Sequence, residues 1–395
     1  MMRKLAAVQL LKTALPKLET PFYYYDLDLL GQTLTAAVEA AGKYGFHLHY
    51  AFKANFNDRI LEMIKNAGIG ADCVAGNEVR KAVNVGFSAD QIVFAGVGKS
   101  DKEIRYALSQ DIFAFNVESL QELEVINQLA GEVGKTASVA LRINPNVDAQ
   151  THHYITTGLD ENKFGIMQDD LQACLTLLDK CENLHLIGVH FHVGSQITDL
   201  GVFKSLCVKA NEINSWFDER GRRLQVINVG GGLGIDYQDP DGQPIPDFAA
   251  YFQVFHQFLE LKDRQEVHFE LGRSLVGQCG SLFSRVLYVK NGIKKNFLIL
   301  DAGMTELLRP ALYQAHHKIE VFDKSLEADQ SGSVRYDVVG PICESSDCFG
   351  KEVLLPESFR GDVVVIRSAG AYGEVMASHY NLREEIRYVY DDRLN

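Results

Sequence analysis

Eight short apolar segments of β type recur between Tyr50 and Arg273, and their spacing constrains the fold of this chain more than any other feature. Segments with helical periodicity separate them, and residues 120–132 show that periodicity well. Strands that alternate with helices in this way are typical of a (β/α)8 barrel of the TIM type, whose functional groups gather at the carboxyl ends of the strands. The predicted strands are 50–54, 71–75, 92–96, 113–117, 139–144, 188–194, 226–232 and 268–272.

A doubly wound open sheet is the competing α/β fold, but its glycine-rich turn usually follows the first strand. Here the triple glycine, residues 230–232, follows the seventh predicted strand, which favours the barrel. After Arg273 the chain has β-type segments separated by turn residues, with few helical stretches. The sequence therefore predicts a barrel domain, residues 27–273, and an all-β domain, a β-sandwich or Greek-key barrel, built from residues 1–26 and 274–395. The strand-like segment 22–26 is the N-terminal part of this second domain.

Charge and cysteine content limit the partners and the compartment. The formal net charge of −13 argues against nucleic acid or an anionic membrane as a partner, because neither attracts an acidic surface. The seven cysteines are odd in number and scattered, without a Cys-x-x-Cys pair, which is typical of reduced thiols in a cytoplasm. We therefore expect a cytoplasmic protein, and a small-molecule substrate is compatible with this charge.

Lys53 lies in the first predicted strand of the barrel, where a cationic side chain needs an explanation. An unpaired buried ammonium is costly, so such a lysine is paired, neutralised, or consumed as an imine with a carbonyl cofactor. A lysine whose stem lies in the barrel wall and whose head reaches water is the simpler interpretation. The polar motifs at the ends of later strands favour the imine.

Those motifs hold what pyridoxal 5′-phosphate requires: an imine, a phosphate site and a protonated ring nitrogen that lets the ring accept negative charge. Glu270, near the end of the eighth predicted strand, is placed to pair with the ring nitrogen, and Arg273 to bind a phosphate or a carboxylate. Residues 230–232 bring backbone N–H groups close to the phosphate, and Ser195 adds a hydroxyl. The sequence therefore predicts a pyridoxal phosphate site at the carboxyl ends of the strands.

His190 and His192 alternate along one predicted strand, so one ring is expected toward the barrel interior and the other toward the helices. That excludes a metal site made from this pair alone, and His192 is the candidate to stack on the cofactor ring. Cys343 and Cys348 lack a second ligand pair, so no metal ion is expected there. Three other pairs lack a partnering acidic motif and are interpreted as surface or packing histidines: His47/His49, His152/His153 and His316/His317.

Over nearly its whole length the chain resembles the fold-type III, alanine-racemase-like pyridoxal phosphate decarboxylases, and among them the diaminopimelate decarboxylases. Besides the motifs above, the resemblance rests on segments 309–313, 340–347 and 370–373, of which 340–347 (GPICESSD) is the most specific. Two departures stand out. Leu271 replaces the proline common in the family's Glu-Pro-Gly-Arg motif, and His379 stands where the family often has asparagine.

The resemblance implies that Lys53 forms the Schiff base and that Cys343 donates the proton, so these two are the expected catalytic residues. The implied cofactor contacts are Lys53, His192, Ser195, Gly230, Gly231, Gly232, Glu270, Gly272, Arg273 and Tyr372. The implied substrate contacts are Arg273, Arg309, Tyr313, Glu344 and Tyr372. It also implies a two-fold homodimer in which Cys343 reaches the barrel of the partner.

The expected reaction is decarboxylation of meso-2,6-diaminopimelate to L-lysine and carbon dioxide, the last step of lysine biosynthesis. Arg273 and Arg309 are expected to pair with the distal carboxylate and Glu344 with the distal ammonium, so a substrate without that carboxylate would leave arginine unpaired. Two alternatives stay open. One is a decarboxylase of another basic amino acid or of a carboxylated polyamine on the same fold, and the other is a non-catalytic homologue that binds pyridoxal phosphate.

Overall fold

A computed structural model describes residues 11–147, 163–324 and 332–393, so His152 and His153 lie outside the described residues. The chain divides into two compact units. The barrel unit comprises residues 33–234 and 246–274, and the β unit comprises residues 1–32, 235–245 and 275–395. In the described part of the chain, no helix is long and apolar enough to cross a membrane.

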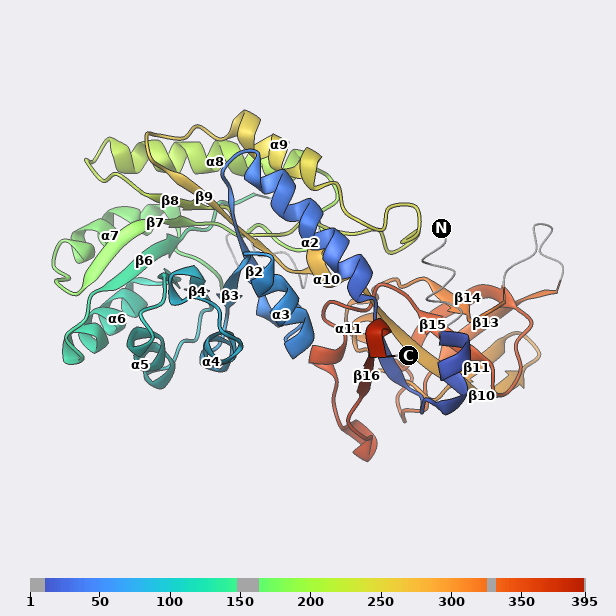
Figure 1. The fold of residues 1–395 in the computed structure, drawn as a ribbon. Coiled ribbons are helices and arrows are strands. Elements are labelled where there is room, and N and C mark those ends of the chain that lie inside the picture. The colour runs from blue at the N-terminus through green and yellow to red at the C-terminus, as the bar shows by residue number, and fades with distance from the viewer. Residues whose placement is uncertain (1–10, 148–162, 325–331, 394–395) are drawn as a thin grey trace. The chain divides into compact units, whose positions relative to one another are not determined.

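Eight parallel strands form a closed barrel in chain order (Figure 1), as the sequence predicts. The first and last strands, β2 (His47–Ala51) and β9 (Glu266–Leu271), pair in parallel and close it. Their register sets His47 opposite His268 and His49 opposite Glu270. The strands between them are β3 (Gly70–Cys73), β4 (Ile92–Phe94), β5 (Ala114–Val117), β6 (Ala137–Arg142), β7 (Leu184–His190) and β8 (Val226–Asn228).

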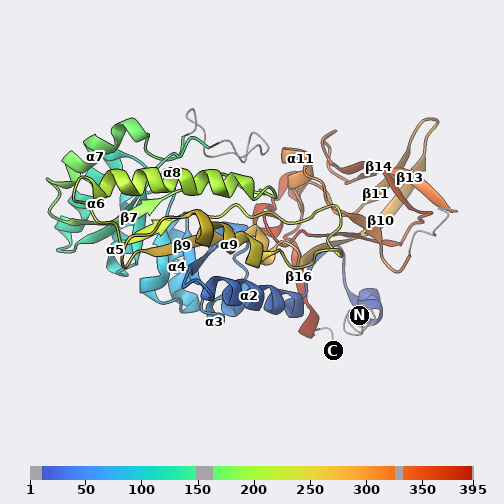
Figure 2. The ribbon, with the colours of Figure 1, turned by 90° about the horizontal axis from the view of Figure 1, so that it is seen from above.

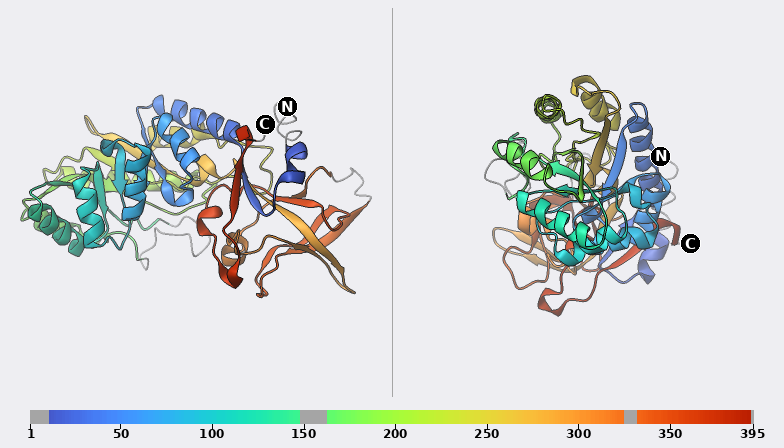
Figure 3. Two further views of the ribbon diagram at one scale, coloured as in Figure 1. Left: turned by 60° about the horizontal axis from the view of Figure 1, so that its bottom comes forward. Right: turned by 90° about the vertical axis from the view of Figure 1, so that its left-hand side faces the viewer.

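Helices surround these strands, as the blue-to-yellow helices in Figure 3 show, and α8 and α9 lie side by side in Figure 2. Helix α9 packs Phe252 and Phe255 edge-on against Phe269 of β9, each with ring centroids 4.9 Å apart. The helices are α2 (Leu27–Gly42), α3 (Asp58–Asn66), α4 (Gly76–Val85), α5 (Asp101–Ser109), α6 (Leu120–Glu132), α7 (Leu171–Leu178), α8 (Gly201–Asp218), α9 (Phe248–Phe258) and α10 (Arg273–Val276).

The predicted strands are displaced along the chain relative to the observed ones. The first is predicted to end at residue 54, but β2 ends at Ala51 and a 3-10 turn, η2 (Phe52–Ala54), follows. The apolar pattern continues past the strand ends because the first residues of these loops are buried as well. Strands β2 and β9 begin earlier than predicted, at His47 and Glu266, because polar residues start them, whereas β4 and β8 begin at the predicted residues, 92 and 226.

The β unit contains one mixed sheet of eight strands. The N-terminal strand β1 (Phe22–Tyr25) pairs antiparallel with β10 (Gly280–Asn291), and the rings of Phe22 and Phe283 stack at 5.2 Å. The predicted strand 22–26 therefore joins the later strands, and a closed parallel barrel followed by a mostly β unit confirms the predicted fold class. The remaining elements are β11 (Asn296–Leu300), α11 (Arg309–Tyr313), β12 (Ile319–Val321), β13 (Ser333–Val339), β14 (Cys348–Pro356), β15 (Val363–Ile366) and β16 (Arg387–Tyr390).

Candidate active site

Lys53 lies in the turn η2, directly after β2, and not on the strand itself. Tyr50 supports this turn, because its hydroxyl donates a hydrogen bond to the Asn55 carbonyl oxygen at 2.8 Å. The lysine side chain is half-buried, less enclosed than the sequence suggests. Its position at the carboxyl end of a barrel strand is where barrels of this type carry their functional groups.

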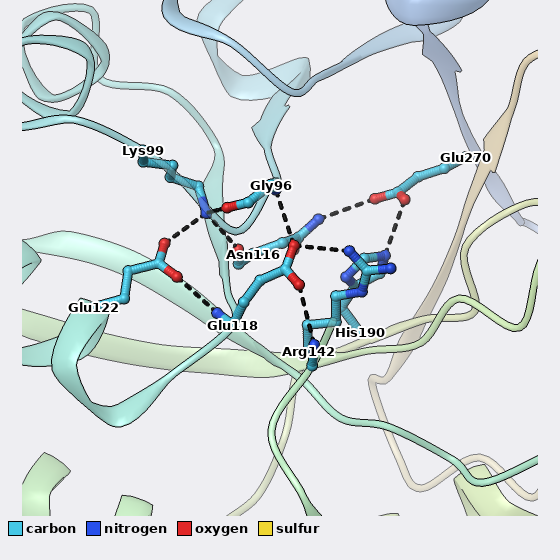
Figure 4. A network of polar contacts seen from close by, with 9 residues as sticks. Gly96, Lys99, Asn116, Glu118, Glu122, Arg142, His190 and Glu270 are labelled. Carbon is cyan, nitrogen blue, oxygen red and sulfur yellow. Dashed lines mark hydrogen bonds and ion pairs between the residues drawn. The ribbon is translucent and has the colours of Figure 1, made fainter. Parts of the chain in front are cut away.

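Glu270 of β9 is buried, and its carboxylate accepts three hydrogen bonds. Asn228 Nδ2 donates to Oε1 at 2.7 Å. Asn116 Nδ2 donates to the same oxygen at 3.0 Å, and His190 Nε2 donates to Oε2 at 2.9 Å (Figure 4). Burial alone would raise the pKa of this carboxyl, but His190 and the other groups around it outweigh burial and hold the pKa well below its usual range. Glu270 is therefore ionised at neutral pH.

Two buried ion pairs fix the neighbourhood of Asn116 (Figure 4). Lys99 Nζ donates to the Asn116 carbonyl oxygen at 2.8 Å and to Glu122 at 2.5 Å, and Arg142 donates to Glu118 at 2.7 Å. The Lys99 side chain is 1% exposed, so removing either partner of its ion pair would leave a buried charge uncompensated. The sequence prediction missed these residues because Lys99 and Glu122 lie among other polar residues, in GKSDK and ESLQELE, where one charged side chain does not stand out. Their position near the carboxyl ends of strands was the available signal.

His190 and His192 do not point to opposite sides of the barrel wall, so that expectation is wrong. Residues two apart along a strand share a face, so the alternation of side chains does not separate these two rings, and β7 itself ends at His190. His190 bonds Glu270, while His192 Nδ1 accepts a hydrogen bond from the Gly231 N–H at 3.4 Å. Desolvation, followed by the charge of Lys53, lowers the pKa of His192 well below its usual value, so this ring is neutral.

The glycine turn after β8 brings three stretches of backbone into close approach. A Cβ on Gly231 would lie 1.9 Å from the carbonyl oxygen of Glu270, and one on Gly230 would lie 2.2 Å from that of Phe191. Gly230 and Gly232 also adopt φ angles of +69° and +112°, which side chains with a Cβ rarely adopt. The turn therefore requires glycine, and it places backbone close to the carboxyl ends of the strands.

Arg273 begins α10, directly after Gly272, and its Nη2 donates to Ser195 Oγ at 3.0 Å. The structure thus brings together the guanidinium and the hydroxyl that the sequence assigns to anion binding. Leu271, which stands in place of the family's proline, is buried and pairs with Tyr50 of β2. The departure from the family motif therefore leaves the end of β9 within the sheet.

Asp72, at the end of β3, is a further polar group that the sequence prediction missed. Burial, followed by the charge of Glu270, raises its pKa well above the usual value, and Lys53 partly opposes that rise. Within the described residues its Oδ1 is buried without a hydrogen-bond partner. With a lysine amine, an ionised carboxylate, an arginine–serine pair and a glycine turn nearby in the barrel unit, the residues present fit pyridoxal phosphate.

Arg309, in the β unit, begins α11 and is 5% exposed. Its Nη1 donates to His317 Nε2 at 2.8 Å, and its Cζ lies 4.7 Å from the centre of the Tyr237 ring. His317 Nδ1 donates in turn to the Arg367 carbonyl oxygen at 2.8 Å, which leaves Nε2 as the acceptor. The prediction did not identify Tyr237 and gave His317 only a surface or packing role. Tyr313, at the other end of α11, is half-buried.

The loop between β13 and β14 carries Cys343 and Glu344. Asp347 fixes this loop, because its Oδ2 accepts a hydrogen bond from the Ile342 N–H at 2.7 Å. Cys343 and Glu344 are exposed in the single chain. Glu344 Oε1 accepts a hydrogen bond from the Tyr380 hydroxyl at 2.7 Å. The loop therefore presents a thiol and a carboxylate on a fixed backbone.

Tyr372 follows β15 and adopts a φ of +56°, a left-handed conformation that costs a non-glycine residue about 1–2 kcal/mol. Such backbone strain is found preferentially at functional sites.

His379, the other departure from the family pattern, is exposed and donates through Nδ1 to the Arg383 carbonyl oxygen at 3.1 Å. Another expectation is wrong: His47 does have an acidic neighbour, since its Nε2 lies 3.9 Å from Glu266 Oε2.

Comparison with known proteins gives consistent results. Residues 30–277 match the family described as pyridoxal-dependent decarboxylase, pyridoxal binding domain. The diaminopimelate decarboxylase of Bacteroides thetaiotaomicron is 55% identical over 370 residues, which cover 93% of this chain and 94% of that protein. The crystal structure of diaminopimelate decarboxylase from Helicobacter pylori complexed with L-lysine is 39% identical, covering 96% of this chain and 93% of that one, with a TM-score of 0.89. The M. jannaschii enzyme in complex with L-lysine is 34% identical, covering 97% and 89%, with a TM-score of 0.87.

Proposed function

We infer that this chain, which belongs to the diaminopimelate decarboxylase family of pyridoxal-dependent decarboxylases, converts meso-2,6-diaminopimelate to L-lysine and carbon dioxide. It is a carboxy-lyase that uses pyridoxal 5′-phosphate, and the reaction is the last step of lysine biosynthesis. The observation that carries the mechanism is the ionised Glu270, held by Asn116, Asn228 and His190 at the end of β9.

When bound, pyridoxal phosphate supplies a protonated ring that takes up the negative charge left at the α-carbon as carbon dioxide departs. We propose that Lys53 Nζ holds the cofactor covalently and that Glu270 keeps the ring nitrogen protonated, because a permanent negative charge beside that nitrogen favours its protonated form. The neutral ring of His192 would stack on the cofactor. The proposed contacts with the phosphate and the remaining cofactor atoms are Ser195, Gly230, Gly231, Gly232, Gly272, Arg273 and Tyr372.

Arg309 is the proposed partner of the distal carboxylate of the substrate, together with Arg273 and Tyr313. The bond to His317 and the Tyr237 ring support this role, because they fix the plane of the guanidinium before a carboxylate arrives. Glu344 would bind the distal ammonium, and Tyr372 would contact the substrate as well. Selectivity then comes from the end of the substrate that does not react.

Cys343 is the proposed proton donor to the α-carbon. Because Cys343 and Glu344 are exposed at the tip of a fixed loop, they are suited to complete the active site of a partner subunit in a two-fold homodimer.

A cytoplasmic location is proposed on the ground that all seven cysteines are free. The proposed domains are residues 27–273 for the barrel and residues 1–26 with 274–395 for the β domain.

The rival functions differ at the distal end of the substrate. Ornithine, lysine and a carboxylated polyamine lack a second α-amino acid group at the distal end, so a decarboxylase of these substrates has none to bind. A non-catalytic homologue would turn over none of these compounds. The test is turnover of meso-diaminopimelate and of ornithine by the purified protein with added pyridoxal phosphate. The proposal expects L-lysine from the first substrate and a far smaller kcat/KM for the second. Preference for ornithine would establish the rival.

A further inference from the structure

Four polar side chains gather at the amino ends of β2 and β9, the two strands that close the barrel. His47 and His49 lie two residues apart on β2 and so share a face, as do Glu266 and His268 on β9. The register sets His47 opposite His268. The cluster lies at the barrel end opposite the carboxyl ends that carry Lys53 and Glu270, and the function proposed above does not use it.

Hydrogen bonds fix the tautomers of the two buried histidines in this cluster. His49 Nδ1 lies 3.1 Å from the carbonyl oxygen of Gln91, which only accepts, so Nδ1 carries the hydrogen. His49 Nε2 is therefore an acceptor, and His268 Nδ1, 2.8 Å away, must donate to it. A Cβ on Gly70 would lie 2.7 Å from His49 Nδ1 and 2.4 Å from Gln91 O, so this first bond depends on a glycine there.

The chain of donors ends at His268 Nε2, which in the neutral ring has a lone pair and no hydrogen. That atom lies 3.4 Å from Glu266 Oε2, and a carboxylate oxygen is also an acceptor. Two acceptors at this separation repel each other unless a hydrogen donor or a cation lies between them, and a metal ion accepts a lone pair from each.

The ligand atoms of His47, Glu266 and His268 all lie within 4.8 Å of one another. Zinc at about 2.0–2.2 Å from nitrogen and oxygen ligands in a tetrahedron sets those ligands roughly 3.3–3.5 Å apart. The separation between His268 Nε2 and Glu266 Oε2, 3.4 Å, falls in that range. His47 Nε2 lies 3.9 Å from the same oxygen, and its ring stacks on that of His268 with centroids 4.7 Å apart. Because the His47 side chain is 51% exposed, it has room to turn out of the stack and direct Nε2 toward the ion.

A pocket of about 190 Å³ borders this cluster and gives an ion a route of entry. Its lining includes His47, His49 and His268, together with Gly70 and Gln91, which hold His49 in place. His268 donates its Nδ1 hydrogen to His49, and His49 in turn donates to the Gln91 carbonyl oxygen. A metal-binding histidine normally donates its second ring N–H to an outer-shell acceptor, and His49 takes that position for His268.

We propose that His47, Glu266 and His268 bind a divalent transition-metal ion of the zinc class, with His49 and Gln91 as the outer shell that orients His268. Two imidazole nitrogens and one carboxylate oxygen suit such an ion, and water completes the tetrahedron. The ion links the first barrel strand to the last. Its binding therefore stabilises the closed barrel against unfolding and leaves the catalytic end untouched.

Zinc binding to the chelator-treated holoenzyme, measured by equilibrium dialysis and metal analysis, tests the proposal. The expected result is one tightly bound zinc ion per chain, with affinity about 100-fold or more weaker in Glu266→Gln and in His47→Ala. His185→Ala is the matched control, because His185 is an exposed histidine near the start of another barrel strand, β7. Cobalt(II) in place of zinc should give a tetrahedral visible spectrum in wild type and His185→Ala and in neither of the other two variants.

Urea unfolding provides the second measurement. Zinc should raise the midpoint of wild type and of His185→Ala and leave that of Glu266→Gln unchanged. Both altered ligands are at least half exposed, so their variants are expected to fold, and circular dichroism with unchanged turnover checks this. Equal zinc affinity in wild type, Glu266→Gln and His47→Ala would overturn the proposal, because the ion would then bind elsewhere, for example at a thiol. Absence of zinc binding at micromolar free zinc would overturn it too.

Discussion

Gly231→Ala tests whether the close backbone approach at the glycine turn positions the catalytic carboxylate. The added Cβ would lie 1.9 Å from the Glu270 carbonyl oxygen, whereas ordinary contact begins at 3.4 Å, so the two backbones must separate by about 1.5 Å. That movement disrupts the 2.8 Å hydrogen bond from the Glu270 N–H to the Gly230 carbonyl oxygen. A displacement of about 1 Å at a catalytic group costs on the order of 100-fold in rate. We therefore expect kcat/KM to fall by at least about 100-fold.

Overpacking of this kind costs about 1–3 kcal/mol of stability, less than the roughly 5–15 kcal/mol that holds a typical domain folded. The variant should therefore fold, and far-UV circular dichroism checks this. Carbon dioxide release at saturating pyridoxal phosphate gives the rate. Gly98→Ala is the matched control, because a Cβ there has no neighbour within 4 Å, and it should behave as wild type. Wild-type turnover in a folded Gly231→Ala variant would refute the positioning argument.

Three further variants test the assigned roles. Lys53→Ala should abolish the near-visible absorption of the bound cofactor, and an adduct that borohydride still fixes to this variant would contradict the role of Lys53. Arg309→Ala should lower kcat/KM for meso-diaminopimelate by the equivalent of about 2–4 kcal/mol, because a charge-assisted contact is lost. Arg264→Ala is the control and should leave kcat/KM unchanged, because the Arg264 side chain is 92% exposed. Unchanged kinetics would leave Arg309 outside the substrate site. Mixing Lys53→Ala with Cys343→Ala chains should restore roughly a quarter of wild-type activity, since about half of the dimers are mixed and each has one intact site. If mass-tagged chains exchange and no activity returns, Cys343 serves the cofactor of its own chain.

The periodicity of the sequence was sufficient to predict the barrel, because each strand is buried and each helix has one apolar face. Strand ends were harder to predict. Lys53 lies in a turn that the apolar pattern does not distinguish from the strand, because its neighbours Phe52 and Ala54 are buried as strand residues are. In the β unit, Gly350, Lys351 and Glu352 interrupt the apolar pattern of β14, so the sequence indicates this strand only weakly. Pairing with β13 overrides that local preference, as tertiary contacts often do for strands.

The predicted site residues were found from charged groups and glycines that stand out in the sequence. Asn116 and Asn228 could not be found in the same way, because an asparagine in a strand carries no signal until its partner is known. Both donate to Glu270 from separate strands, and only the closed barrel brings these strands together. The pairing of His47 with Glu266 likewise joins the first strand to the last. His49 and His268, which are hydrogen-bonded on the same two strands, lie 219 residues apart in the sequence.

Glu270→Gln provides the most direct test of the central claim that an ionised Glu270 sustains decarboxylation. Glutamine keeps the size of the side chain and removes its charge. The measurement is carbon dioxide release from meso-diaminopimelate by wild type and variant, at equal and independently determined cofactor content. The account predicts carbon dioxide and L-lysine in equal amounts from wild type, and a rate lower by about three orders of magnitude in the variant although cofactor still binds. A near-normal rate in Glu270→Gln, or no carbon dioxide from the wild-type holoenzyme, would contradict it.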